Sequence, residues 1–160
     1  KVFAVLCNER EDVQLTLVGD ISRSRRIQLL SLINSQYRDR VVFLGKMDNA
    51  ELADVYRNTV CSVLASDKEI FGMVVLESMY FQVPCLASSV AGPKTVINDH
   101  VNGILEDNYD IACWKKDINY LLDNAKMRER MGIEARKKVL RYFTWDKIAY
   151  KMMNKIGKRV

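Results

Sequence analysis

Short apolar segments alternate with longer amphipathic ones along most of the chain. Four short segments are rich in β-branched residues and end in Gly or Ser, which is typical of buried parallel strands. They lie at 13–19, 40–45, 60–66 and 83–89. Helices are predicted between them at 22–37, 48–58 and 71–82, the second with Asp48 as its N-cap and Glu51 at capping-box spacing. The alternation predicts an α/β fold, a Rossmann-like open parallel sheet flanked by helices.

Helices are also predicted at both ends of the chain. A possible edge strand at 102–107 is followed by three predicted helices, at 109–124, 126–142 and 145–157. The chain begins without Met in a helical pattern that places Val2, Phe3 and Leu6 on one face. We therefore expect residues 1–160 to be a single domain and a fragment of a larger protein.

Composition narrows the class of protein. The chain has 160 residues, 49% of them apolar and 28% charged, as in a globular domain with its own core. The four cysteines form no C-x-x-C pair, and Cys61 and Cys85 lie in apolar runs, so we expect buried thiols and a cytoplasmic location. The single histidine, His100, has no partners at ligand spacing, and no metal site is predicted.

Positive charge is concentrated at the C-terminus. From 126 to 160 there are twelve Lys and Arg against three Asp and Glu. Within 145–157, Lys147, Lys151 and Lys155 recur every fourth residue beside an apolar stripe. This basic amphipathic helix fits packing on the sheet or on another domain, which we favour, or contact with an anionic membrane.

The stretch EIFGMVVLES, 69–78, has the pattern of a ligand site. A strand ends at Ser66, and the next helix is expected to start near Phe71. The backbone N–H groups of Phe71, Gly72, Met73 and Val74 would then be unpaired donors, which suit a phosphate or diphosphate.

Two carboxylates converge on the same place. Helical side chains lean toward the N-terminus, so Glu77 can reach back to the helix start, while Glu69 approaches it from the loop. Carboxylates bind pairs of hydroxyls, and a nucleotide sugar offers both hydroxyls and a diphosphate. Spacing alone favours the simpler interpretation, an acidic loop before a core helix.

The wider sequence resembles the C-terminal domain of the family-4 retaining glycosyltransferases, which have the two-domain GT-B architecture. The resemblance rests on a double-glutamate core and on flanking segments over nearly the whole chain. The core reads Glu69-Ile-Phe71-Gly72 and Glu77, then Pro84-Cys-Leu-Ala87, Ala91-Gly92-Pro93 and Asn102-Gly103. The flanking segments are LVGD (17–20), VVFLGKMDNAELADVY (41–56), KMRERMGIEAR (126–136) and FTWDKIA (143–149).

The resemblance implies a role for each residue of this core. Glu77 would bind the ribose of the donor nucleotide, and Glu69 would bind hydroxyls of the transferred sugar. The backbone of 70–74, from Ile70 to Val74, would hold the diphosphate and sugar. The loop Gly45-Lys46-Met47 would lie against the base. No catalytic base or nucleophile can be assigned.

The resemblance also implies the reaction and the partners. The chain would be the donor-binding half of a hexosyltransferase of polysaccharide and cell-envelope biosynthesis, acting with retention on a glycan or lipid-linked acceptor. It would need no metal or cofactor, and UDP-sugar is the first choice of donor ahead of GDP- or ADP-sugar. Its partner would be its own N-terminal domain, with peripheral membrane contact an open alternative and no nucleic acid. A basic segment that meets the diphosphate would precede Lys1, and the fragment alone would be inactive.

Departures and alternatives remain. Ile70, Phe81-Gln82, Ala91-Gly92 and Lys94-Thr95 differ from the residues common in the family, which puts contacts at 91–95 in question. Another GT-B enzyme, an epimerase or a phosphorylase, is an alternative, but the residues characteristic of those enzymes are not evident in this sequence. A non-catalytic Rossmann-like module that binds nucleic acid through the basic C-terminus is the remaining alternative.

Overall fold

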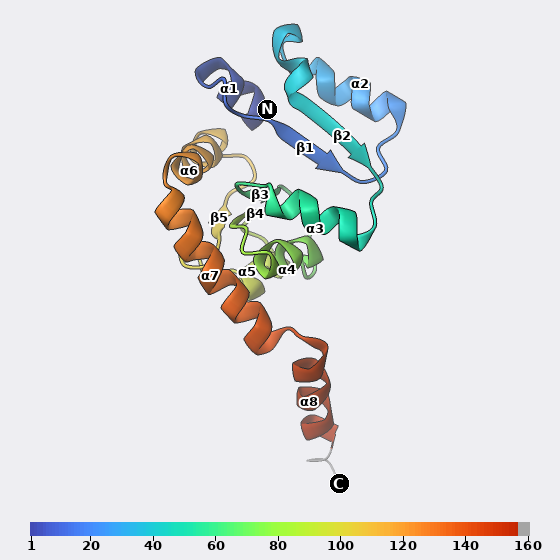
Figure 1. The fold of residues 1–160 in the computed structure, drawn as a ribbon, viewed down its shortest axis with the longest axis vertical. Coiled ribbons are helices and arrows are strands. Elements are labelled where there is room, and N and C mark those ends of the chain that lie inside the picture. The colour runs from blue at the N-terminus through green and yellow to red at the C-terminus, as the bar shows by residue number, and fades with distance from the viewer. Residues whose placement is uncertain (157–160) are drawn as a thin grey trace.

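The computed structural model of the protein describes residues 1–156 as alternating strands and helices (Figure 1). The expected end of the last helix at residue 157 lies outside the described residues. The elements are α1 (Val2–Glu9), β1 (Leu15–Val18), α2 (Arg23–Ser31), the 3-10 helix η1 (Ser35–Arg40), β2 (Val41–Gly45), α3 (Asn49–Arg57), β3 (Ser62–Leu64), α4 (Met73–Tyr80), β4 (Cys85–Ser88), α5 (Ala91–Val96), β5 (Ile104–Glu106), α6 (Ile111–Asp123), α7 (Ala125–Tyr142) and α8 (Trp145–Ile156).

All strand pairs in the described residues are parallel, which confirms the predicted α/β fold class. β1 pairs with β2, while β3, β4 and β5 form a second piece in that order, with β5 at the edge as predicted. The single continuous sheet that we expected is instead divided between β1 and β3. Each strand is also shorter than its apolar run.

The core surrounds β4, whose side chains alternate between two layers of helices. On one face, Leu86 packs with Trp114 and Leu121 of α6 and with Met131 of α7. On the other face, Cys85 and Ala87 belong to a cluster formed with α4, α5 and α7. Burial raises the pKa of Cys85 to about 12, so it remains a thiol, as its apolar run predicted.

The predicted start of α3 is confirmed, whereas the helix predicted before it is interrupted. Asp48 caps α3 by accepting the N–H groups of Ala50 and Glu51 at 2.9 Å, and Glu51 returns a bond to the Asp48 N–H at 2.9 Å. The single helix predicted at 22–37 is wrong, since α2 ends at Ser31. Asn34 breaks it because its side chain accepts the Gln36 N–H and starts the separate 3-10 turn.

Helix α7 packs closely against the turn that leads into β4. A Cβ atom on Gly132 would lie 2.0 Å from the carbonyl oxygen of Gln82, so only glycine fits there. Gln82 itself has a positive φ of 62°. This contact fixes α7 across the end of α4.

Helix α8 extends from the end of α7 away from the sheet (Figure 1). Its apolar stripe consists of Ile148, Met152 and Ile156, of which Met152 and Ile156 are 60% and 67% exposed and Ile148 is half-buried. The expectation that this helix packs on the sheet is therefore wrong, because most of its apolar stripe is exposed and among the described residues its main neighbour is α7. Packing on another domain stays a prediction. Within residues 1–156, no helix combines the length and apolar character of a membrane span.

Candidate functional site

The loop between β3 and α4 is anchored to the loop after β5. The Ser66 N–H donates to the Ser88 hydroxyl at 2.8 Å, and this hydroxyl also bonds to the Asn108 side chain. The Asn108 amide donates to Asp67 at 2.7 Å, and the Tyr109 hydroxyl does so at 3.2 Å. This network fixes the path of the chain as it approaches Glu69.

Glu69 caps the start of α4 with its own carboxylate. Its Oε1 atom accepts the Phe71 N–H at 3.2 Å and the Gly72 N–H at 2.9 Å. The helix begins at Met73, two residues later than predicted, because Gly72 serves as N-cap with a φ of 86° in the left-handed region. Two of the four donors that we expected to be free are therefore occupied.

The other two donors remain available. Among the described residues, no hydrogen bond uses the N–H groups of Met73 and Val74. These are the first amides of the helix proper, where the dipole favours an anion. The Met73 and Val74 side chains are 59% and 42% exposed, so the helix start opens to solvent.

Gly92 packs against the loop that carries Glu69, a contact that was not recognised from the sequence. Its N–H donates to the Glu69 carbonyl at 2.9 Å, and a Cβ there would lie 2.6 Å from that oxygen and 2.6 Å from the Phe71 nitrogen. The short helix α5 brings Gly92 to this position. Only a residue without a side chain lets the two segments touch.

Glu77 lies one turn into α4 and is half-buried. The Tyr56 hydroxyl of α3 donates to its Oε2 atom at 3.4 Å. Tyr56 is buried and its ring stacks on Phe81 at 5.4 Å, and burial together with the Glu77 charge raises the Tyr56 pKa. Sequence reasoning missed Tyr56, although a tyrosine on the buried face of a helix needs a partner for its hydroxyl.

The structure groups most of the predicted site residues. Glu69, Ile70, Phe71, Gly72, Met73 and Val74 surround the start of α4, with Glu77 on the same helix. The loop of Gly45, Lys46 and Met47 follows β2 at the carboxyl end of its strand. In residues 1–156, no hydrogen bond joins this loop to Glu69 or Glu77.

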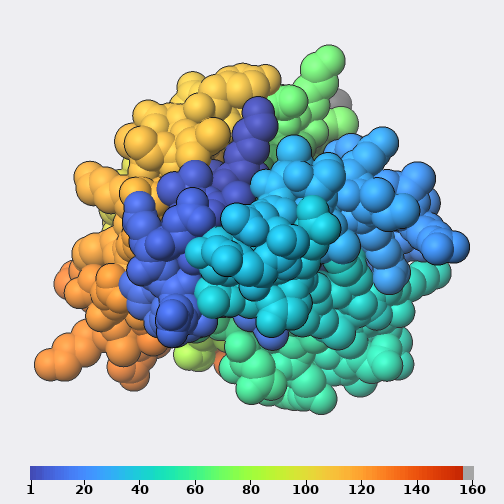
Figure 2. Space-filling model, turned by 90° about the horizontal axis from the view of Figure 1, so that it is seen from above, coloured from blue at the N-terminus to red at the C-terminus, as the bar shows by residue number. Residues whose placement is uncertain are grey.

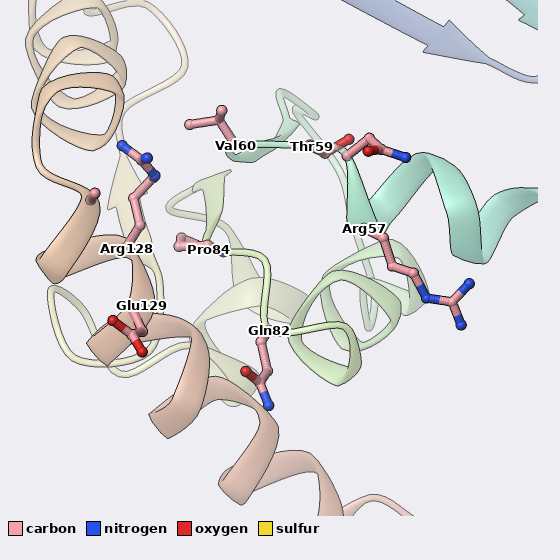
Figure 3. Close-up of a pocket in the computed structure, with 9 residues that line it drawn as sticks. Arg57, Thr59, Val60, Gln82, Pro84, Arg128 and Glu129 are labelled. Atoms are coloured by element: carbon pink, nitrogen blue, oxygen red, sulfur yellow. The ribbon is translucent and has the colours of Figure 1, made fainter.

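A hollow of about 360 Å³ lies at the opposite end of the second sheet piece (Figure 3). Thr59 and Val60 enter it just before β3, Pro84 just before β4, and Arg128 and Glu129 from α7. Ligands of open parallel sheets bind beyond the carboxyl ends of the strands, whereas this hollow is at the amino ends. It contains none of the predicted site residues.

The comparison with known families decides the classification. The profile of the family described as "Glycosyl transferases group 1" matches residues 1–138. The chain belongs to this family. A D-inositol 3-phosphate glycosyltransferase of Xylanimonas cellulosilytica is 33% identical over 147 residues, which cover 90% of this chain and 35% of that protein. The chain thus spans about a third of the length of the curated relatives it matches.

Solved structures of other proteins share this fold. The sucrose-phosphate synthase of Thermosynechococcus elongatus superposes with a TM-score of 0.85 at 27% identity, covering 98% of this chain and 41% of that one. HepE of Anabaena, solved in complex with UDP-glucose, has a TM-score of 0.85 at 20% identity, covering 98% of this chain and 44% of that one. The predicted membership of a glycosyltransferase family is confirmed.

Proposed function

We propose that residues 1–160 form one domain, the donor-binding half of a retaining glycosyltransferase that moves a hexose from a nucleoside diphosphate sugar to a glycan or lipid-linked acceptor. The observation that carries the proposal is the start of α4, where two glutamates flank the N–H groups of Met73 and Val74, which donate to no acceptor among the described residues. Family membership and the UDP-glucose held by HepE support a nucleotide sugar as the ligand.

The diphosphate is assigned to the helix start. Met73 and Val74 offer two N–H donors at the positive end of the helix dipole, and Gly72 leaves the approach open. Glu69 keeps its Oε1 atom on the backbone as a cap, which leaves Oε2 to accept a sugar hydroxyl. The carboxylate then binds the sugar without leaving the amides that hold it in place.

The ribose is assigned to Glu77. Tyr56 holds one carboxylate oxygen, and the other accepts a ribose hydroxyl. The loop of Gly45, Lys46 and Met47 is proposed to lie against the base. UDP is the proposed nucleotide, ahead of GDP and ADP.

The remaining part of the cleft is assigned to the N-terminal domain of the same polypeptide. Ile70 is 94% exposed beside the helix start, and the apolar stripe of α8 is uncovered, as expected of surfaces that meet another domain. The 160-residue chain alone is expected to transfer no sugar. Transfer by this chain alone would contradict the proposal.

Calorimetry with UDP- and GDP-sugars on the complete enzyme tests the donor site. Loss of a hydrogen bond to a charged group costs about 1.5–3 kcal/mol, so Glu77→Ala is expected to weaken binding by about 10- to 100-fold. Glu129→Ala, in the hollow at the opposite strand ends, is the matched control and should bind as the wild type does. Binding that is indifferent to Glu77 would contradict the assignment.

Three further measurements test the alternatives. Chelation by EDTA should leave donor binding unchanged, because the diphosphate is assigned to the N–H groups at the start of α4 and not to a metal. Co-sedimentation with anionic vesicles tests whether α8 contacts a membrane, with Lys151→Glu as the variant that should abolish it. Salt-dependent binding to arbitrary DNA or RNA, with none to nucleotide sugars, would favour the nucleic-acid module instead.

A further inference from the structure

A closed ring of hydrogen bonds holds the first residues of the loop between β3 and α4. The Ser66 N–H donates to the Ser88 hydroxyl at 2.8 Å, and this hydroxyl also bonds to the Oδ1 atom of Asn108. The Asn108 amide group donates in turn to the Asp67 carboxylate at 2.7 Å. Asp67 follows Ser66 in the chain, so the ring closes through the backbone. It joins two successive residues of this loop to β4 and to the loop after β5.

Chemistry fixes the direction of the bonds in this ring. An ionised carboxylate only accepts hydrogen bonds, so the Asn108 side chain turns its amide nitrogen toward Asp67 and its oxygen toward Ser88. The Ser88 hydroxyl, which accepts the Ser66 N–H, shares its one proton between that oxygen and the Leu64 carbonyl. Asn108→Asp would place a second carboxylate against Asp67, and neither group could donate. An amide at position 108 is therefore required as long as position 67 is an aspartate.

The ring connects an exposed loop to the most buried strand. Ser88 in β4 is fully buried, Asn108 is half-buried and Asp67 is exposed. The Tyr109 hydroxyl adds a second bond to Asp67 at 3.2 Å, and the Asp67 charge raises the pKa of this hydroxyl, which therefore remains a donor. Figure 2 shows gold residues near 110 and green residues near 70 side by side at the upper edge of the molecule.

Glu69 lies between this ring and a second anchor. Only Lys68 separates it from Asp67, and the Lys68 carbonyl accepts the Ser66 hydroxyl at 3.0 Å. On the other side, the Glu69 carbonyl accepts the Gly92 N–H at 2.9 Å. The backbone is thus held both before and at position 69. The place of the free carboxylate oxygen, Oε2, consequently depends on the ring.

The part of the site assigned to the nucleotide is held in a different way. Glu77 and the N–H groups of Met73 and Val74 belong to α4, which is anchored in the core by Val75 and Met79, both fully buried. In the part of the chain that the structure describes, no hydrogen bond joins the ring to Glu77. Loss of the ring should therefore move Glu69 and leave α4 in place.

We propose that Asn108 is a positioning residue for the transferred sugar, which sets where Glu69 presents its free oxygen without touching the donor itself. It acts through Asp67 and Ser88. The inference rests on the proposed function, because it takes the start of α4 as the donor site. Since Glu69 is assigned to the sugar and Glu77 to the ribose, loss of the ring weakens binding of a nucleotide sugar and spares binding of the bare nucleotide. General damage to the domain would weaken both.

Calorimetry on the complete enzyme compares UDP-glucose with UDP, or GDP-mannose with GDP where that pair binds more tightly. In Asn108→Asp the sugar nucleotide should bind about 10-fold more weakly, as expected for the loss of about one hydrogen bond to a charged group. The bare nucleotide should bind as it does to the wild type. Asn124→Asp is the matched control, because its amide also donates one bond, to the Tyr120 carbonyl at 2.8 Å, beside the hollow at the amino ends of the strands. It should bind both ligands like the wild type.

The double variant Asp67→Asn with Asn108→Asp separates positioning from charge. It again sets one amide against one carboxylate, with the donor now at position 67, so sugar-nucleotide binding should recover most of the 10-fold loss. Amide hydrogen exchange follows the same ring without a ligand. The N–H groups of Phe71 and Gly72, which donate to Glu69, should lose protection in Asn108→Asp and regain it in the double variant.

Each failure has its own signature. Sugar-nucleotide binding that is unchanged in Asn108→Asp but weakened in Glu77→Ala would overturn this inference and leave the donor site in place. Equal losses for the sugar nucleotide and the bare nucleotide, or no recovery in the double variant, would also overturn it, because the substitution would then act through general damage. Donor binding that is indifferent to both Glu77 and Asn108 would overturn the proposed function and this inference together.

Discussion

Strand β4 has four fully buried side chains, whereas β1 has none that is buried. Both are short parallel strands from apolar segments of similar composition. β4 has a paired strand on each side and helices on both faces, while β1 is paired only with β2 within residues 1–156. The difference shows that an apolar run specifies a strand but that its burial depends on neighbours supplied by other segments.

Truncation of one leucine in each piece should show the largest difference in stability. Leu86→Ala in β4 removes a fully buried side chain and is expected to lower the free energy of unfolding by about 3 kcal/mol. Leu44→Ala in β2 removes one that is 41% exposed and should cost about 1 kcal/mol. Urea unfolding of both variants measures the difference. Equal losses would mean that the two pieces are equally buried in solution.

Two glycines give the next largest contrast. Gly132→Ala places a Cβ atom against the Gln82 carbonyl and should cost about 2 kcal/mol, because neither backbone segment can move without displacing α7. Gly45→Ala meets no atom within 4 Å but keeps a φ of 75°, a strain of about 1 kcal/mol. Thermal unfolding separates them. A harmless Gly132→Ala would show that α7 is not packed against this turn.

Helix caps should give a smaller contrast between the same regions. Asp48 completes a capping box on α3, and Asp48→Ala is expected to cost about 1 kcal/mol. Ser22 caps α2 with one longer bond of 3.3 Å to the Arg25 N–H, and α2 buries no residue, so Ser22→Ala should cost about 0.5 kcal/mol. Chemical denaturation of the two variants checks the order.

Local patterns predicted the features that depend on residues close in sequence. The capping box of Asp48 and Glu51 needs only a spacing of three, and the strand runs need only period and composition. The end of α2 before Asn34 was not predicted, because the apolar helical pattern continues through this position. The helix nevertheless stops there, since the Asn34 side chain forms its own hydrogen bond with the backbone. The carboxylate of Glu69 capping Gly72 was also local, but the same residue was interpreted only as a ligand contact.

Contacts between distant segments could not be predicted in this way. Gly92 against Glu69, Gly132 against Gln82 and Tyr56 against Glu77 each join residues more than twenty positions apart. Nothing in either local sequence specifies the other partner. The donor site was predicted as a set of residues along one segment, whereas its supports come from α3, α5 and the loop after β5.

A carboxyl pair in the better buried piece provides the smallest effect. A hydrogen bond with Asp117, together with burial, raises the pKa of Glu106 in β5 from its ordinary value of 4.5 to about 7. The folded protein therefore binds more protons than the unfolded chain between these values, and the stability that this proton provides, complete below pH 4.5, is lost as pH rises through 7.

Glu106→Gln keeps a donor for Asp117 but cannot titrate, so its melting temperature should fall less between pH 5 and pH 8 than that of the wild type. Glu11→Gln, in the exposed connection before β1, is the control and should follow the wild-type profile. Parallel profiles for Glu106→Gln and the wild type would mean that Glu106 is ionised across this range and that the pair contributes nothing to the stability of the three-stranded piece.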